Sequence, residues 1–257
     1  MIEFDIKTGR SPLLVAAIHN GHSIRAELLP YLRLTDKERE REEDPYTASL
    51  TDISDNSLTI FTSRFEVDIN RPREKAVYNS PIDAWGLKLY NQKLPDALVQ
   101  RSLQYYDEFY IKIGQILKEL LSKNRWLIVY DLHTYNHRRK GYDRYEAPEA
   151  NPEVNIGTGN VIPGRWQCVI DCLLQKLSEY NFEGRNLDVR ENVKFRGGYF
   201  TEWLSSQFGN RVCPIAIEFK KFFMDEWTGN INSDQLSHLR QLLISTIHPV
   251  LNKTMLV

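Results

Sequence analysis

The run WLIVYDLH, residues 126–133, decides the fold. Its first five residues are apolar or aromatic and do not alternate with polar residues, which is typical of a strand buried on both faces of a parallel sheet. Three other short runs, at residues 13–18, 58–62 and 214–219, have the same character. We therefore predict strands at these three places and at residues 126–131.

Stretches with helical period lie between and after these strands. The strongest spans residues 98–122, where apolar residues recur every three or four positions before the turn-like SKN. Shorter ones span residues 164–178, 199–208 and 234–248. Strands that alternate with helices predict an α/β fold with a mixed, mostly parallel central sheet and helices on both faces. No repeat or flexible linker interrupts the chain, so we expect residues 1–257 to form a single domain.

Three segments fit neither pattern, namely residues 36–52, 64–87 and 134–163. The last contains Pro, Gly and Asn throughout. An irregular segment of that length in a compact domain usually carries function or is disordered.

The composition is that of a soluble globular protein, with 42% hydrophobic and 26% charged residues. The net charge of −1 gives no general attraction to nucleic acid or to membranes, and the basic run HRRKGYDRY is expected to be a solvated loop. The start, MIEFDIKTGRSP, lacks the apolar segment of a signal peptide. No apolar run approaches the roughly 18 residues that cross a bilayer. We expect a cytoplasmic protein with neither nucleic-acid nor membrane partners.

Polar residues with reactive side chains follow or interrupt the predicted strands. LLVAAI leads into His19 and His22, WLIVYDL leads into His133, and PIAIEF contains Glu218. In open α/β sheets ligands bind beyond the carboxyl ends of the strands. We therefore expect these side chains to lie close together.

A metal site is one interpretation of these histidines. Histidines at two strand ends, with a carboxylate, are a usual ligand set for a catalytic zinc ion. His19 and His22 can face one ion if Gly21 lets the backbone turn tightly, but the pair can equally be ordinary polar residues at a strand exit. His133 adds a histidine directed at the same edge, and Asp131 can orient a ligand from behind.

Glu218 and the dipeptide Asn70-Arg71 suggest catalysis and anion binding. A carboxylate within IAIEF is costly to bury unless it is paired in a salt bridge or faces a polar cleft. Beside a metal, such a carboxylate can take a proton from water and pass it to a leaving group. Arg71 can hold a substrate carboxylate through two parallel hydrogen bonds, with Asn70 adding a third, although NR is also a common dipeptide.

Together these motifs resemble those of the N-formylglutamate amidohydrolase family, which is similar to the aspartoacylase and zinc carboxypeptidase group. The matching stretches follow the family order across residues 18–223: IHNGHSI, EEDPYT, SRFEVDINRPRE, VYDLHTYNH, NIGTGN, FRGGYFTEW and PIAIEFKKFF. SRFEVDINR together with DLH is the most specific part. The resemblance implies a zinc carboxypeptidase-like (phosphorylase/hydrolase-like) fold, with one Zn²⁺ ion or another divalent metal as cofactor.

The resemblance also implies a role for each matched residue around the metal. His19, which matches the histidine of the family's P-H-x-G motif although Ile18 replaces the proline, and His133, from a D-x-H motif, are implied ligands. Two residues compete to be the third ligand. His22 stands where carboxypeptidase relatives have a glutamate, whereas Asp44 lies in an acidic pair that formylglutamate enzymes share. Glu218 is the implied general base.

The remaining matched residues are implied to contact the substrate. Asn70 and Arg71, in DINR, match residues that bind its carboxylate. Arg64 matches an arginine that polarises the scissile carbonyl. Arg196 and Tyr199, in FRGGY, are implied pocket residues.

The leading hypothesis is a zinc-dependent hydrolase that cleaves the linear amide of a small, acidic N-acylated amino acid. N-formylglutamate, split into glutamate and formate, is the first candidate substrate. A zinc carboxypeptidase or a cell-wall peptide amidase would keep the site and change the substrate, with residues 134–163 shaping the pocket. A binding protein that has lost catalysis would keep the fold and hold little metal.

Overall fold

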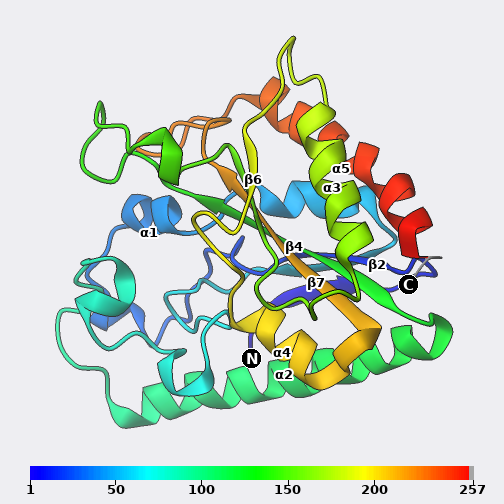
Figure 1. Cartoon of the computed structure of the whole chain (residues 1–257). Coiled ribbons are helices and arrows are strands. Elements are labelled where there is room, and N and C mark those ends of the chain that lie inside the picture. The colour runs from blue at the N-terminus through cyan, green and yellow to red at the C-terminus, as the bar shows by residue number, and fades with distance from the viewer. Residues whose placement is uncertain (255–257) are drawn as a thin grey trace.

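The computed structural model describes residues 1–254, which fold around a seven-stranded sheet of order β1-β3-β2-β4-β7-β5-β6 (Figure 1). The strands are β1 (Phe4–Lys7), β2 (Leu13–Ala17), β3 (Asn56–Ile60), β4 (Leu127–Tyr135), β5 (Val154–Gly157), β6 (Val189–Glu191) and β7 (Val212–Lys220). Strands β3, β2, β4 and β7 run parallel, as do β5 and β6. Strand β1 pairs antiparallel with β3, and β5 antiparallel with β7. The predicted mixed, mostly parallel sheet is confirmed.

Helices cover both faces of this sheet, as predicted (Figure 1). The α-helices are α1 (Asp36–Glu42), α2 (Asp96–Lys123), α3 (Gln167–Glu179), α4 (Tyr199–Phe208) and α5 (Ser233–Lys253). Leu13 and Val15 of β2 pack into the core formed with α3 and α5, whereas Leu14 and Ala16 pack into the core formed with α2 and α4. Successive side chains of a strand point to opposite faces, so a strand covered on both sides needs an unbroken apolar run.

The structure departs from the predicted elements at the end of β4. This strand continues to Tyr135, so His133 lies within it rather than after it. Strand β7 extends alongside and pairs Glu218 with His133. The segment 134–163 is therefore not one loop, because it begins with the end of β4 and contains β5, which bonds to β7. Strands β1, β5 and β6 and helix α1 are additional elements, too short for a periodic pattern.

The arrangement places the carboxyl ends of the parallel strands at one edge of the sheet. The chain leaves this edge after β2, β3, β4 and β7, and each of these exits carries polar residues. Within residues 1–254, no helix combines the length and apolar character that crossing a membrane requires.

Candidate metal and active site

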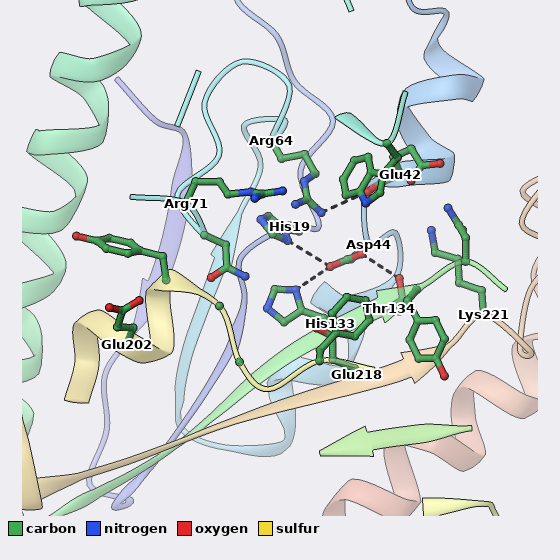
Figure 2. A pocket seen from close by; sticks show the side chains of 18 of the residues that line it. His19, Glu42, Asp44, Arg64, Arg71, His133, Thr134, Glu202, Glu218 and Lys221 are labelled. Atoms are coloured by element: carbon green, nitrogen blue, oxygen red, sulfur yellow. Dashed lines mark hydrogen bonds and ion pairs between the residues drawn. The ribbon is translucent and has the colours of Figure 1, made fainter. Parts of the chain in front are cut away.

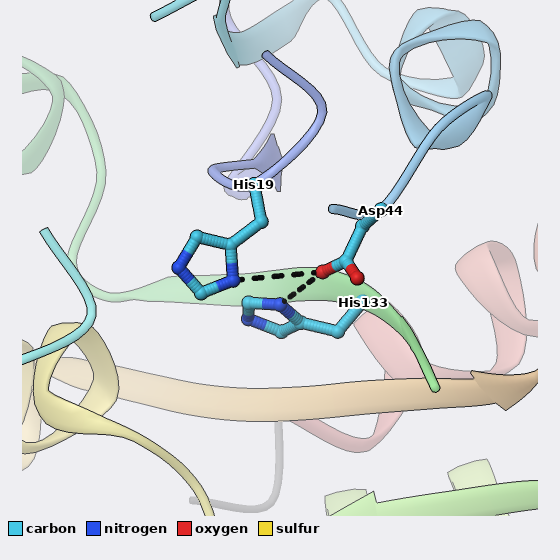
Figure 3. Close-up of side chains that lie close together, drawn as sticks. All are labelled: His19, Asp44 and His133. Atoms are coloured by element: carbon cyan, nitrogen blue, oxygen red, sulfur yellow. Dashed lines mark hydrogen bonds and ion pairs between the residues drawn. The ribbon is translucent and has the colours of Figure 1, made fainter. Parts of the chain in front are cut away.

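Three buried side chains meet at this edge of the sheet (Figure 3). His19 follows β2, Asp44 follows α1 and His133 lies near the end of β4. One ligand atom from each of the three lies within 4.8 Å of the other two. Asp44 Oδ2 is 2.9 Å from His133 Nδ1 and 3.5 Å from His19 Nδ1. Burial alone would raise the pKa of Asp44, but the two histidines hold it well below its usual value.

Backbone pairing explains why residues so distant in sequence converge. Strands β2 and β4 are parallel neighbours, with Ala16 opposite Asp131, so the residues that follow reach the same edge. The amide of Asp44 donates to the carbonyl of His19 at 2.9 Å. The Thr134 hydroxyl adds a hydrogen bond of 3.2 Å to Asp44 Oδ1. The carboxylate is thus held against both histidines by the main chain and by a neighbouring side chain.

In each histidine, Nε2, the ring nitrogen that points away from Asp44, lies next to another aspartate. His19 Nε2 is hydrogen-bonded to Asp68 Oδ1 at 2.7 Å, and His133 Nε2 lies 3.1 Å from Asp131 Oδ2. Burial lowers the pKa of His133, but the charges of Asp131 and Glu218 outweigh it and raise that pKa well above its usual value. A carboxylate behind a histidine favours the tautomer protonated at Nε2, which leaves Nδ1 free to bind a metal.

The donor set fits a metal ion. His19 Nδ1 is buried and has no hydrogen-bond partner among the described residues. Buried polar atoms are nearly always paired, so an unpaired nitrogen directed at a carboxylate calls for a ligand. Two imidazole nitrogens and one carboxylate oxygen are ligands that zinc accepts, with a fourth position left open.

His22 lies outside this group. Its Nδ1 is 2.5 Å from Glu43 Oε2, and its imidazole is 36% exposed. The Arg39 guanidinium donates to its carbonyl. Gly21 directs the loop this way, because a Cβ there would lie 2.3 Å from the backbone of Phe61. Of the two competing residues, the structure brings Asp44, and not His22, to His19 and His133.

Asp68 links the cluster to Arg64. One oxygen of this fully buried carboxylate accepts from His19, and the other accepts from Arg64 Nη2 at 2.8 Å and from the Tyr78 hydroxyl. Arg64 Nη1 has a contact of 3.5 Å to the carbonyl of Glu42 and lines the same pocket as the cluster. Neither Asp68 nor Tyr78 was predicted as a site residue, although Asp68 is the first residue of DINR.

Glu218 lies beside the cluster, opposite His133 on the neighbouring strand (Figure 2). Its carboxylate has no ion pair or hydrogen bond with other residues of the described chain. The alternative that Glu218 forms an internal salt bridge therefore has no support among these residues. Burial, together with the negative charges of Asp44 and Asp131, raises its pKa to about 8. A half-buried carboxylate with a raised pKa beside a ligand cluster is suited to proton transfer.

Asn70 and Arg71 border the other side of the cluster. Asn70 Oδ1 accepts from the amide of Phe200 at 2.9 Å, which leaves its amide nitrogen as a donor. Arg71 is 41% exposed, and its nearest carboxylate, Asp68, is 3.9 Å away. Tyr199 lines the pocket with these residues, whereas Arg196 is exposed and is not among the lining residues.

The cluster lies in a cavity of about 480 Å³ (Figure 2). Lining residues that the sequence did not single out are Glu42, Trp85, Arg139, Asn160, Glu202 and Lys221. Lys221 is buried and its Nζ donates to the carbonyls of Arg41 and Glu43, at 2.7 and 2.8 Å. Burial lowers the pKa of Lys221 to about 8. These contacts fasten the loop that carries Asp44.

Two histidines and an aspartate, converging beside a free carboxylate and a free guanidinium at the carboxyl edge of a parallel sheet, are typical of a metallohydrolase site. The sequence points to the same class. Residues 11–224 match the sequence model of the family described as N-formylglutamate amidohydrolase, and the chain belongs to that family.

Solved structures with the same fold support the assignment of the architecture. An N-formylglutamate amidohydrolase from Ralstonia eutropha JMP134 aligns over 100% of both chains with a TM-score of 0.76 and 19% identity. A gene product of Agrobacterium tumefaciens aligns over 98% of this chain and 96% of its own, with a TM-score of 0.71 and 16% identity. No curated protein matches the chain in sequence.

Proposed function

We propose that this protein is a zinc-dependent amidohydrolase that cleaves the amide bond of a small N-acylated amino acid. The observation that carries the proposal is the convergence of His19, Asp44 and His133 in a cavity that also holds Glu218 and Arg71. A ligand set, a proton acceptor and an anchor for a carboxylate are the three parts that such a hydrolysis requires.

His19 Nδ1, His133 Nδ1 and the Asp44 carboxylate would hold the zinc ion. Their geometry supports Asp44, rather than His22, as the third ligand. When bound, zinc supplies Lewis acidity, which polarises a carbonyl and lowers the pKa of water. Asp68 and Asp131 orient the two imidazoles from behind.

Arg71 and Asn70 bind the substrate carboxylate and so place the scissile amide beside the cluster. Glu218 accepts a proton from the water whose oxygen attacks the acyl carbon. It then returns this proton to the amide nitrogen as the carbon–nitrogen bond breaks, which yields a carboxylic acid and a free amine. Arg64, held by Asp68, donates to the carbonyl oxygen as negative charge develops there.

N-formylglutamate is the first substrate to test, since the family and the Ralstonia eutropha relative bear its name. The zinc-loaded protein is incubated with N-formylglutamate, N-acetylaspartate and short peptides, and the released amines are quantified. Release of amino acid from an N-acyl substrate, abolished by a chelator and restored by zinc, is the expected result. Turnover of peptides alone would replace the proposal with a peptidase, and no turnover with zinc bound would contradict it.

A further inference from the structure

Most charged side chains that line the cavity already have a partner within the protein. Glu42 is paired with Arg139 at 2.7 Å, and Arg64 with Asp68 at 2.8 Å. Lys221 donates to two backbone carbonyls. Their charges hold the walls of the cavity together, so they have little capacity left to select a substrate.

Apart from Glu218, the proposed proton acceptor, two lining side chains of opposite charge, Arg71 and Glu202, make no hydrogen bond within the described residues. The Arg71 guanidinium makes no hydrogen bond within residues 1–254, and its nearest carboxylate, Asp68, is 3.9 Å away. The Glu202 carboxylate has neither an ion pair nor a hydrogen bond in that part of the chain. Figure 2 shows both on the same side of His19 and His133, away from Lys221. Glu202 lies in the first turn of α4, three residues after Tyr199, which also borders the cavity.

We infer that the amino acid released by this enzyme carries a cationic side chain, which Glu202 recognises while Arg71 binds the carboxylate. The inference rests on the proposed function and narrows its substrate class, because it expects a cationic side chain in place of the acidic side chain of N-formylglutamate. In an N-acyl amino acid the carboxylate and the side chain are attached to the same carbon atom. A carboxylate held at Arg71 therefore directs the side chain along the same side of the cavity.

The negative charge of Glu202 determines which substrate side chain binds there. A terminal ammonium or guanidinium group gains a charge-assisted hydrogen bond from this carboxylate. An acidic side chain, such as that of glutamate, would lie beside a like charge instead. The repulsion between the two carboxylates weakens the binding of acidic substrates. An acidic residue near a helix N-terminus also stabilises the helix, but that role affects unfolding and not the choice between substrates.

The test compares kcat/KM for N-formyl-L-lysine, N-formyl-L-norleucine and N-formyl-L-glutamate with the zinc-loaded protein. The lysine and norleucine compounds have side chains of similar length and differ in charge. We expect the lysine compound to be preferred over norleucine by about fivefold, because Glu202 is partly solvated, and glutamate to be the poorest of the three. In Glu202→Gln the ratio of lysine to norleucine falls to about one.

Glu119→Gln is the matched control, since Glu119 is an exposed glutamate on α2 outside the cavity. It removes the same charge and should keep the ratio of the parent protein. Glu202→Arg should reverse the order and favour the glutamate compound. Equal rates for lysine and norleucine, or a ratio that Glu202→Gln leaves unchanged, would overturn the inference.

A second measurement separates this inference from the proposed function. The melting temperature of the zinc-loaded protein is followed with L-lysine, L-norleucine or L-glutamate, the products of the three compounds. If no compound is hydrolysed but L-lysine alone raises the melting temperature, and only when Glu202 is present, recognition stands and the proposed reaction falls. If hydrolysis occurs without selectivity for the cationic side chain, the reaction stands and the inference falls.

Discussion

Two buried carboxylates that lie beside histidines, Glu226 and Asp44, differ in the groups that donate hydrogen bonds to them. Glu226 accepts from the backbone amides of His137 and Arg138, at 2.7 and 3.0 Å, and from Arg41 at 3.2 Å. Asp44 accepts instead from His133 Nδ1 and from the Thr134 hydroxyl, at 2.9 and 3.2 Å, and its carboxylate receives no main-chain amide among the described residues. One imidazole nitrogen beside each carboxylate, Nδ1 of His137 and Nδ1 of His19, has no hydrogen-bond partner in that part of the chain. Main-chain amides hold Glu226, so we interpret it as a structural anchor, whereas the partners of Asp44 are side chains that are able to bind a metal ion.

The comparison shows that burial and charge alone do not identify a metal site. Both carboxylates are at most 2% exposed, and both have pKa values below the usual range. The difference lies in the donors, which at Glu226 include two main-chain amides whose positions are fixed by the backbone. At Asp44 the nearest partners are imidazole nitrogens, which can turn from hydrogen bonding to metal binding without any change in the backbone.

The largest effect is expected from Glu218, the proton acceptor of the proposed mechanism. Glu218→Gln keeps the shape and should leave zinc bound, but it removes the proton acceptor. We expect kcat for the best N-acyl substrate to fall by roughly three orders of magnitude. Steady-state kinetics with parallel zinc analysis measures this, and full activity in a folded, zinc-loaded Glu218→Gln protein would rule out the mechanism.

A smaller effect is expected when a carboxylate behind a ligand is changed. Asp68→Asn keeps the volume but no longer stabilises the Nε2-protonated form of His19, so zinc affinity should fall roughly 10- to 100-fold. Competition with a zinc-binding dye measures the affinity. Glu226→Gln is the control, and it should bind zinc as the parent protein does. An equal loss in both variants would mean that the surroundings of Asp44 and of Glu226 do not differ in function.

Glu226→Gln should instead lower the free energy of unfolding, by about 2 kcal/mol, because a buried, hydrogen-bonded charge is lost. The pKa of Glu226 is held near 2 by His137 and Arg41 against the opposing effect of burial, below its unfolded value of 4.5. Its contribution is therefore fully present above about pH 4.5 and is lost as the pH falls toward 2. Urea unfolding of the metal-free protein between pH 3 and 7 should show a smaller pH dependence in the variant. An identical slope would contradict the assignment.

The smallest effect on metal binding is expected at His22, because its imidazole is engaged with Glu43 rather than with the cluster. His22→Ala should retain zinc at the parent stoichiometry and change the affinity less than about threefold. Elemental analysis after dialysis provides the measurement. Loss of zinc in this variant would return His22 to the ligand set in place of Asp44.

Much of the fold could be predicted from the sequence, since strands buried on both faces need continuous apolar runs, as in β2 and β4. The short strands β5 and β6 could not, because their place at the edge depends on pairing with β7 and with each other. Helix α1, DKERERE, has no apolar period, although the capping box from Thr35 to Glu38 marks its start.

The site was predictable where a residue acts from a strand and less so where it acts from a loop. His133 and Glu218 follow directly from the paired strands that carry them. The choice between Asp44 and His22 depends on how two loops fold against each other, which local sequence does not determine. Lys221 and Glu202 could not be predicted for the same reason. Only the tertiary structure shows that Lys221 donates to two carbonyls, and that the Glu202 carboxylate has no partner within residues 1–254.

The central claim is that His19, Asp44 and His133 bind the metal ion through the atoms that converge in Figure 3. Anomalous diffraction at the zinc edge, from crystals of the zinc-loaded protein, locates the ion directly. The account predicts one strong peak about 2 Å from His19 Nδ1, His133 Nδ1 and an oxygen of Asp44. A peak at His22 and Glu43, or none at the cluster, would contradict it.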